Sequence, residues 1–260
     1  MSRGFIAGDR SVLRVSGPEA RDFLQGLVTN DVGRLNQGPL YAALLSPQGK
    51  YLFDFFLVPA GADVLVDVHA DRAAALATRL GMYRLRARVE VAPTDLAVAV
   101  GLGDPPSDGF PDPRDPGLGW RAVGADPELM LAGVEPLDPA ELEACRIALG
   151  VPATGVELIP DDSYILEMGF ERLNGVDFRK GCYVGQEVTA RMKHKTELRK
   201  GLVRVRLAGP APPPGTAIAA GDRPAGTLLS TAGDCGLAYL RFDRADGPLT
   251  AGDARITLES

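Results

Sequence analysis

The stretch YLFDFFLV at residues 51–58 has the pattern of a β-strand, and it decides the fold class. Successive side chains of a strand point to opposite faces, so Asp54 shares its face with Leu52, Phe56 and Val58. Asp54 is the single charged side chain of this stretch. A lone carboxylate on an apolar face makes this position a candidate for function.

Neighbouring segments extend this strand into an antiparallel sheet. Residues 41–45 form a hairpin with it around Ser46-Pro-Gln-Gly49, and residues 64–68 continue the sheet. Arginines alternate with apolar residues over 83–91, which predicts a further, solvated edge strand. Capping residues followed by apolar periodicity predict helices over residues 16–28, 71–80 and 138–149. The pattern as a whole predicts an α+β fold.

The remaining segments are rich in proline and glycine. Residues 101–119 contain repeated Asp-Pro and Pro-Asp pairs, which predict a surface loop. From residue 202 onward, short strand-like runs alternate with Gly/Pro loops, which is typical of a small β-barrel or sandwich.

The composition excludes several classes of protein. The chain has 260 residues, of which 45% are hydrophobic and 24% charged, so it is long enough for more than one packed core. It has no run of the roughly 18 apolar residues that a membrane span needs. Its three cysteines form no CxxC pair, which predicts neither a disulfide framework nor a metal site and favours a cytoplasmic location. The net charge of −6 argues against nucleic acid as a general partner.

The densest chemistry lies at residues 178–191, FRKGCYVGQEVTAR. Cys182 precedes a predicted helix and follows Lys180, and both the helix dipole and the cation favour a reactive thiolate. The alternative is that Cys182 is a small buried side chain. Glu187 and Arg191 are spaced as a surface ion pair. Cys145, on an apolar helix stripe, and Cys235, in a strand, are expected to be shielded.

These residues carry a resemblance to known families. The string KGCYVGQE at residues 180–187, with Ala190-Arg191 after it, resembles the signature of the YgfZ-type folate-binding proteins, which are implicated in iron–sulfur cluster maturation. FLQGLVTND at 23–31 and YAALL at 41–45, with Gly49 leading to Asp54, are similar to the glycine-cleavage T protein, an aminomethyltransferase.

The resemblance implies a three-domain cloverleaf with tetrahydrofolate in its central hole. It implies a split N-terminal folate-binding domain at residues 1–48 and 133–195, a ferredoxin-like domain at 49–132 and a C-terminal β-barrel at 196–260.

The resemblance also implies roles for single residues. Tyr41 and Asp54 match folate contacts of the T protein. We expect the motif residues Tyr183, Glu187 and Arg191 to join them, and Cys182 with Lys180 to form the reactive group. The T protein has a glutamate where this chain has Ala148, which predicts the loss of aminomethyl transfer.

We therefore expect a tetrahydrofolate-binding accessory factor that assembles or repairs [4Fe–4S] proteins, with iron–sulfur client or carrier proteins as partners. The alternative is a folate-dependent one-carbon transferase or demethylase, and the residues leave open whether the chain is an enzyme. An RNA-binding role in tRNA modification depends only on the basic run at residues 191–200. That run is otherwise a solvated linker or a site for the polyglutamate tail of folate. His69 is expected to be an exposed strand residue.

Overall fold

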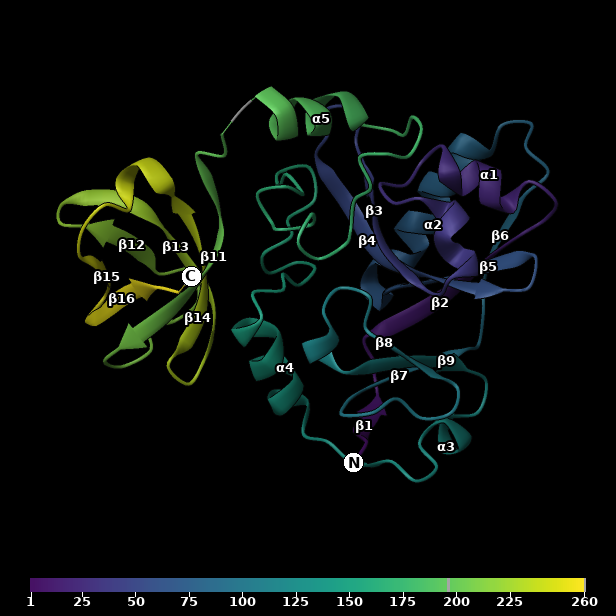
Figure 1. Cartoon of the computed structure of the whole chain (residues 1–260), viewed down its shortest axis with the longest axis horizontal. Coiled ribbons are helices and arrows are strands. Elements are labelled where there is room, and N and C mark those ends of the chain that lie inside the picture. The colour runs from purple at the N-terminus through teal and green to yellow at the C-terminus, as the bar shows by residue number, and fades with distance from the viewer. Residues whose placement is uncertain (196, 260) are drawn as a thin grey trace.

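Two five-stranded sheets and a closed barrel organise the computed structural model, which describes residues 1–195 and 197–259. Figure 1 shows the barrel on one side, the two sheets on the other and helix α4 (Pro139–Ala148) between them. This arrangement confirms the predicted α+β class and C-terminal barrel. None of the helices in the described residues is long and apolar enough to cross a membrane.

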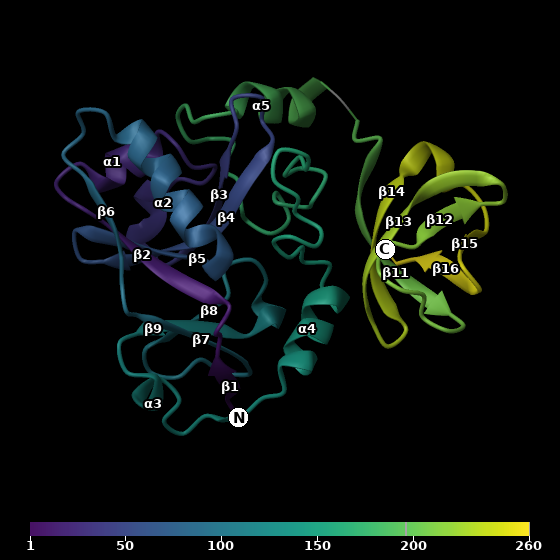
Figure 2. The same ribbon diagram turned by 180° about the vertical axis from the view of Figure 1, so that it is seen from behind.

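The first sheet contains the strand that the alternation predicts. Its order is β3-β4-β5-β2-β6, all antiparallel. The strands are β2 (Arg10–Ser16), β3 (Leu40–Leu45), β4 (Tyr51–Ala60), β5 (Asp63–His69) and β6 (Glu90–Pro93). Figure 2 shows helix α2 (Ala70–Arg84) across one face of this sheet, and helix α1 (Ala20–Gln25) lies near it. Between helices and sheet lies the largest apolar core, which includes Leu24, Phe55 and Leu76.

The second sheet has the order β10-β1-β7-β9-β8. Its strands are β1 (Arg3–Ile6), β7 (Ala97–Leu102), β8 (Gly109–Pro111), β9 (Trp120–Gly124) and β10 (Glu135–Pro136), with the short helix α3 (Pro127–Met130) beside them. Trp120 is buried against Gly4 and Gly101, where a Cβ would lie within 3 Å of its ring. Strand β7 also contacts β2, so the two sheets pack against each other.

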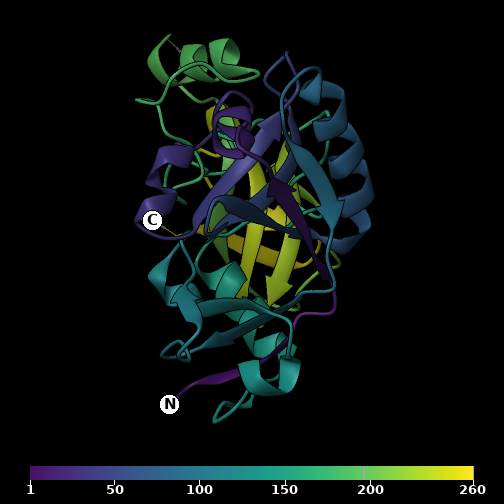
Figure 3. The same cartoon turned by 90° about the vertical axis from the view of Figure 1, so that its right-hand side faces the viewer.

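The barrel contains six strands in the described residues, in the closed order β11-β14-β13-β12-β15-β16. They are β11 (Lys200–Ala208), β12 (Ala217–Ala220), β13 (Arg223–Ala232), β14 (Cys235–Arg241), β15 (Leu249–Ala251) and β16 (Ala254–Leu258). In the side view of Figure 3 the barrel lies behind the two sheets. Helix α5 (Gln186–Lys195) precedes it.

The 3-10 helices are η1 (Val32–Asn36), η2 (Pro116–Leu118) and η3 (Phe242–Arg244). Helix η2 belongs to the proline-rich segment, so the prediction of a surface loop at 101–119 is wrong in part. That segment also supplies strand β8, and it buries Asp112 and Leu118. The segment therefore contributes buried side chains as well as surface turns.

Two other local predictions are wrong. Tyr83 and Arg84 end helix α2, and the next strand begins only at Glu90, because α2 continues past residue 80. The helix predicted over residues 16–28 is shorter, since α1 covers only Ala20–Gln25, and Glu19 at its N-cap makes no capping hydrogen bond. Its carboxylate instead accepts from the backbone N–H and the guanidinium of Arg88.

One predicted domain boundary falls inside a β-hairpin, and another falls just after a helix. The boundary at 48/49 lies in the turn between β3 and β4, which are paired with each other in one sheet. The boundary at 195/196 follows α5, and residue 196 lies outside the described residues. The division into these domains remains a prediction.

Candidate functional site

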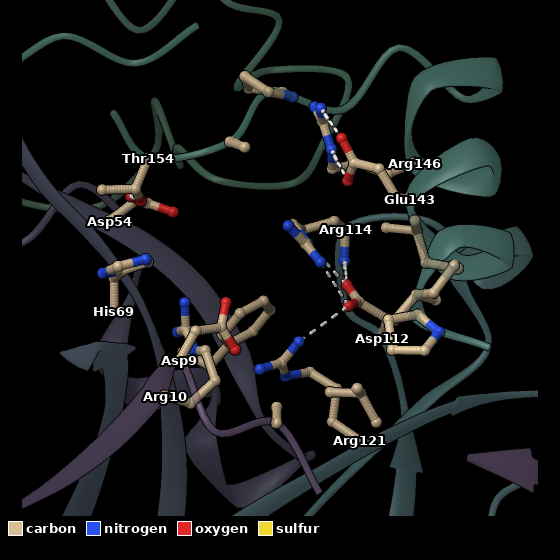
Figure 4. A pocket seen from close by; sticks show the side chains of 18 of the residues that line it. Asp9, Arg10, Asp54, His69, Asp112, Arg114, Arg121, Glu143, Arg146 and Thr154 are labelled. Atoms are coloured by element: carbon tan, nitrogen blue, oxygen red, sulfur yellow. Dashed lines mark hydrogen bonds and ion pairs between the residues drawn. The ribbon is translucent and has the colours of Figure 1, made fainter. Parts of the chain in front are cut away.

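A cavity of about 500 Å³ lies where the two sheets meet α4 and the segment that follows it. Strand β2 contributes Arg10, and β4 contributes Asp54 and Phe56. The second sheet contributes Trp120 and Arg121 from β9, and the other wall includes residues such as Arg114, Arg146 and Thr154. Figure 4 shows Asp54 and Thr154 on one side of this cavity and Asp112 with Arg114 across from them.

Asp54 is held by three hydroxyl groups. Tyr41 donates from Oη to Oδ2 at 3.0 Å, and Tyr51 donates from Oη to Oδ1 at 2.7 Å. Thr154 donates from Oγ1 to the same Oδ1 at 2.6 Å. Burial and the neighbouring carboxylate raise the pKa of both tyrosines, so both hydroxyls stay protonated as donors.

The T-protein resemblance implies that both Tyr41 and Asp54 contact folate, but the two side chains have different environments. Asp54 lines the cavity, on the face that strand alternation predicts. Tyr41 is fully buried between the rings of Phe56 and Phe170 and is not part of the lining. Its hydroxyl therefore orients Asp54 and does not face a ligand.

Three guanidinium groups surround the ring of Phe56. The Cζ atom of Arg121 lies 3.9 Å from the ring centroid, that of Arg114 4.9 Å and that of Arg10 5.6 Å. Stacking on an aromatic face is favourable for a guanidinium, because the face carries the negative part of the ring quadrupole. The cavity thus has a cationic side built on one aromatic ring.

Two buried carboxylates hold these arginines in place. Asp67 accepts from Arg10 Nε at 2.7 Å and from Arg121 Nη2 at 2.6 Å. Asp112 accepts from Arg114 Nε at 3.0 Å and from its Nη2 at 2.8 Å. Burial by itself would raise the pKa of both carboxyls, but the arginine charges and hydrogen bonds lower it below the ordinary value. Both acids are therefore ionised near neutral pH.

Some buried polar atoms at this cavity have no partner in the described residues. They are Nε1 of Trp120, Nε of Arg121 and Nδ1 of His69. His69 ends strand β5 as predicted, but its side chain lines the cavity, so the expectation that it is simply exposed is wrong. Unsatisfied polar atoms in a native interior need an explanation, and a bound ligand is one.

Arg146 connects the cavity to the barrel. It donates to Glu143 through Nε and Nη2 and to buried Glu157 through Nη1 at 3.1 Å. Ser230, on β13 of the barrel, donates to Glu157 Oε1 and accepts from Arg146 Nη2. Ala148, two residues further on, is exposed at the end of α4 and is not part of the lining. The missing glutamate therefore leaves no gap in this cavity.

The KGCYVGQE string lies outside the cavity, in a loop over residues 180–185 and in the first turn of α5. Cys182 is exposed, and α5 begins only at Gln186, so the thiol is not in the first turn of the helix. Neither Cys182 nor Tyr183 is part of the lining, so this cavity does not bring Tyr183 together with Asp54. Tyr183 is buried, and burial raises its pKa to about 12.

Lys180 is buried and fully hydrogen bonded. Its Nζ donates to the carbonyl oxygens of Gln25 at 2.8 Å, Val28 at 2.6 Å and Asn30 at 2.8 Å. Desolvation by burial lowers its pKa to about 8. An ammonium has three donors, so Lys180 has none left for a substrate. Its position fixes the loop that carries Cys182 to the end of α1.

The other predicted residues are on surfaces. Glu187 and Arg191 are exposed on α5 and are not part of the cavity lining. In the basic run, Lys193 pairs with Glu171, and the side chain of Lys195 lies outside the described residues. Cys145 and Cys235 are partly buried, and Cys145 Sγ donates to the carbonyl of Gly117. No group of three or more His, Cys, Asp or Glu in the described chain is arranged to hold a metal ion.

Sequence reasoning missed the arginine cluster. Arg10 lies 57 residues before Asp67, and Arg121 lies 54 residues after it, so no local pattern joins them. Asp112 and Arg114 are in the proline-rich segment that was expected to be a surface loop. The available signal was the Asp-Pro-Arg spacing at 112–114, which allows a bidentate contact two residues apart.

Comparisons with known proteins agree on the fold. Residues 199–260 match the family described as the CAF17 C-terminal β-barrel domain. A solved structure, glycine cleavage system aminomethyltransferase T from Bartonella henselae, matches with a TM-score of 0.80 over 100% of this chain and 85% of that chain. At 15% identity this likeness shows the fold alone, and it confirms the predicted T-protein architecture.

Curated relatives are similar along most of the chain. The iron–sulfur cluster assembly factor IBA57, mitochondrial, is 32% identical in both Homo sapiens and Mus musculus, over 94% of this chain and 79% of each relative. The homologue from Pyricularia oryzae is 30% identical over 99% of this chain and 76% of the relative. These relatives are named as mitochondrial proteins, which overturns the expectation of a cytoplasmic location.

Proposed function

The chain belongs to the IBA57 family of iron–sulfur cluster assembly factors, and from this we propose that it assists the assembly or repair of [4Fe–4S] proteins while holding a reduced folate in the cavity beside Asp54. The KGCYVGQE string supports a YgfZ-type relationship within this proposal. The observation that carries the folate site is the placement of Asp54, a hydroxyl-bonded carboxylate that lines a cavity of about 500 Å³.

The cavity residues fit a reduced folate in their chemistry. Such a ligand has flat rings, several N–H donors and several carbonyl or carboxylate acceptors. Phe56 and Trp120 supply aromatic surface, Asp54 supplies an acceptor, and the guanidiniums supply donors. The lining thus combines aromatic surface with fixed polar groups that can orient a ligand. When bound, tetrahydrofolate would supply a carrier for a one-carbon unit.

Asp54 has capacity left for a ligand. A carboxylate has about four lone-pair positions, and the three hydroxyls use two on Oδ1 and one on Oδ2. The remaining position on Oδ2 can accept one N–H of a pterin or of its aminobenzoyl nitrogen. The tyrosines and Thr154 fix the direction of that position before the ligand arrives, which reduces the cost of ordering on binding.

Cys182 is the group that we propose for the cluster. It is exposed, and the buried ammonium of Lys180 fixes its loop to the end of α1. A stable cluster needs three or four thiolates, so one exposed cysteine serves as a single ligand or contact in a cluster shared with a partner protein. The proposed partners are therefore iron–sulfur carrier or client proteins.

Binding calorimetry on the full chain tests the folate part. Tetrahydrofolate should bind to the wild type, and Asp54→Asn should weaken binding about tenfold, because the amide cannot accept the same N–H with a negative charge. Asp104→Asn, at an exposed aspartate, is the matched control. Equal affinity of wild type and Asp54→Asn would remove Asp54 from the site.

Complementation tests the cluster part. Cells that lack their own family member should recover the activity of [4Fe–4S] enzymes when given the wild-type chain, and less of it with Cys182→Ser. Tetrahydrofolate binding by Cys182→Ser should be unchanged, because the thiol lies outside the cavity. Enzymatic formation of methylene-tetrahydrofolate from an aminomethyl donor would instead favour a transferase.

A further inference from the structure

The cavity contains nitrogen donors that the protein itself does not use. Hydrogen bonds to Asp67 and Asp112 use Nε and Nη2 of Arg10 and Arg114 and Nη2 of Arg121. Across the described residues, the Nη1 atoms of Arg10 and Arg114 have no hydrogen-bond partner, and Nη1 of Arg121 lies 3.7 Å from Asp112 Oδ2 as an ion pair. Nε of Arg121 is buried and has no hydrogen-bond partner in the described residues either. Since all three side chains line the cavity, the open donors belong to its wall.

The arginines cannot easily turn away from the cavity. Their side chains are only 12%, 14% and 7% exposed for Arg10, Arg114 and Arg121. Asp67 and Asp112 orient them, and Phe56 packs against all three guanidiniums. Figure 4 shows Arg114 and Arg121 approaching Asp112 from two sides. A donor set held in this way is preorganised for an acceptor.

The oriented N–H donors, and not a net charge, favour an anionic acceptor here. Three guanidiniums face the carboxylates of Asp67 and Asp112, and the charge of Asp54 also acts on Arg114. Asp9 also lines the cavity but is exposed, and Glu143 is paired with Arg146. Asp54 lies nearby, and its carboxylate accepts from three hydroxyl groups and from no arginine of the described residues.

We infer that Arg10, Arg114 and Arg121 form an anion subsite that binds the glutamate carboxylate of the folate. The inference rests on the proposed folate site and adds the orientation of the ligand in it. Asp54 and Phe56 lie two residues apart on one strand face, a separation of about 6.6 Å. This is comparable to the length of the aminobenzoyl group that separates the bridging nitrogen of folate from its glutamate. A ligand nitrogen at Asp54 therefore brings the carboxylate to the arginines around Phe56.

This assignment differs from one that the charge pattern of the sequence left open, in which the basic run holds the tail. Arg191, Lys193 and His194 of α5 are exposed and are not part of the cavity lining. An exposed cation in water contributes less to binding than a partly desolvated, oriented guanidinium. Binding of the tail by the three arginines and binding by α5 can therefore be distinguished by comparing ligands with and without the glutamate.

Calorimetry with three ligands tests the subsite. Tetrahydrofolate and tetrahydropteroate share the pterin and aminobenzoyl groups, but only tetrahydrofolate has the glutamate. The wild type should bind tetrahydrofolate about tenfold or more tightly than tetrahydropteroate, and Arg114→Gln should remove most of that difference. The fragment p-aminobenzoylglutamate should bind weakly to the wild type and not measurably to Arg114→Gln. Arg86→Gln, at an exposed arginine, should keep the wild-type difference.

Each other outcome has a defined meaning. Equal affinity of the wild type for the two pterin ligands overturns the subsite and leaves the folate site intact. Binding of p-aminobenzoylglutamate with no binding of either pterin ligand removes the proposed folate function but keeps the subsite. If Arg191→Gln and not Arg114→Gln removes the difference, the tail is held by α5 and the inference is wrong. If Arg114→Gln does not fold, the affinity difference between tetrahydrofolate and tetrahydropteroate is measured on the wild type and on Arg114→Lys. A smaller difference in Arg114→Lys supports the subsite, and an unchanged difference contradicts it.

Discussion

Thr154 Oγ1 donates to Asp54 Oδ1 at 2.6 Å, which joins two positions 100 residues apart in the chain. Asp54 belongs to β4, and Thr154 belongs to the segment that follows α4. This hydrogen bond attaches that segment to β4 where the strand lines the cavity. It also gives Asp54 its one hydroxyl partner from outside the β3–β4 hairpin.

Loss of this hydroxyl should have a small effect on folding. Thr154→Val keeps the shape of the side chain but removes the donor, and Asp54 retains two tyrosine hydroxyls. We expect the free energy of unfolding to fall by about 1 kcal/mol, as measured by chemical denaturation. Thr154→Ser should restore most of the loss. A valine variant as stable as the wild type would show that water replaces the hydroxyl.

Lys180 should matter more for stability than for chemistry. Lys180→Met leaves the carbonyl oxygens of Gln25, Val28 and Asn30 without their shared donor in a buried place. We expect a loss of about 3 kcal/mol in the free energy of unfolding. Lys50→Met, at a lysine with an exposed hydrogen bond, is the control and should lose much less. Normal stability together with lost function in Lys180→Met would instead make Lys180 a reactive group.

The arginine cluster should make stability depend on acid pH. The pKa of Asp112 is lowered in the folded chain below its ordinary value of 3.8. Between those two pKa values the unfolded chain binds more protons, so stability falls as pH falls below about 4. Asp112→Asn should show a shallower loss over that range in denaturation measured at a series of pH values. An unchanged slope would mean that Asp67 and other carboxyls account for the acid sensitivity.

The three cysteines should differ in accessibility. Cys182 is exposed, whereas Cys145 and Cys235 are partly buried, and burial raises the pKa of both of those thiols. A small alkylating reagent should therefore label Cys182 first in the native protein, as followed by mass spectrometry of peptides over time. Equal rates at all three positions would contradict this, and labelling after denaturation supplies the reference rate.

The local sequence pattern was sufficient to place Asp54 but not to identify all of its hydrogen-bond partners. Alternation over residues 51–58 placed Asp54 on the cavity face, because the direction of a strand side chain depends only on its position in the strand. The partners of Asp54 were partly visible, since Tyr41 and Tyr51 belong to the same hairpin. Thr154 was not visible, because it reaches Asp54 through a segment with almost no regular structure.

The motif around Cys182 shows where a local sequence pattern fails to predict the surroundings of a side chain. Its residue types are those of a reactive thiol, with a glycine, a lysine and a helix close by in the sequence. In the fold, Lys180 turns inward to carbonyl groups of residues 25–30, and the helix begins four residues after the cysteine. Proximity along the chain therefore did not predict which groups share a local environment. Arg10 and Arg121 could not be found for the same reason, because their shared carboxylate partner, Asp67, is 57 and 54 residues away.

The contact of Ser230 with Arg146 and Glu157 has a consequence for how such chains can diverge. Glu157 is buried, and one of its oxygens depends on a hydroxyl from the barrel. A chimera that received another barrel without a hydroxyl at the position of Ser230 would leave Oε1 of the buried Glu157 without this donor. Barrels from different relatives should therefore be interchangeable only when the segment from α4 to residue 157 is transplanted with them, which makes that segment and β13 a single unit of inheritance.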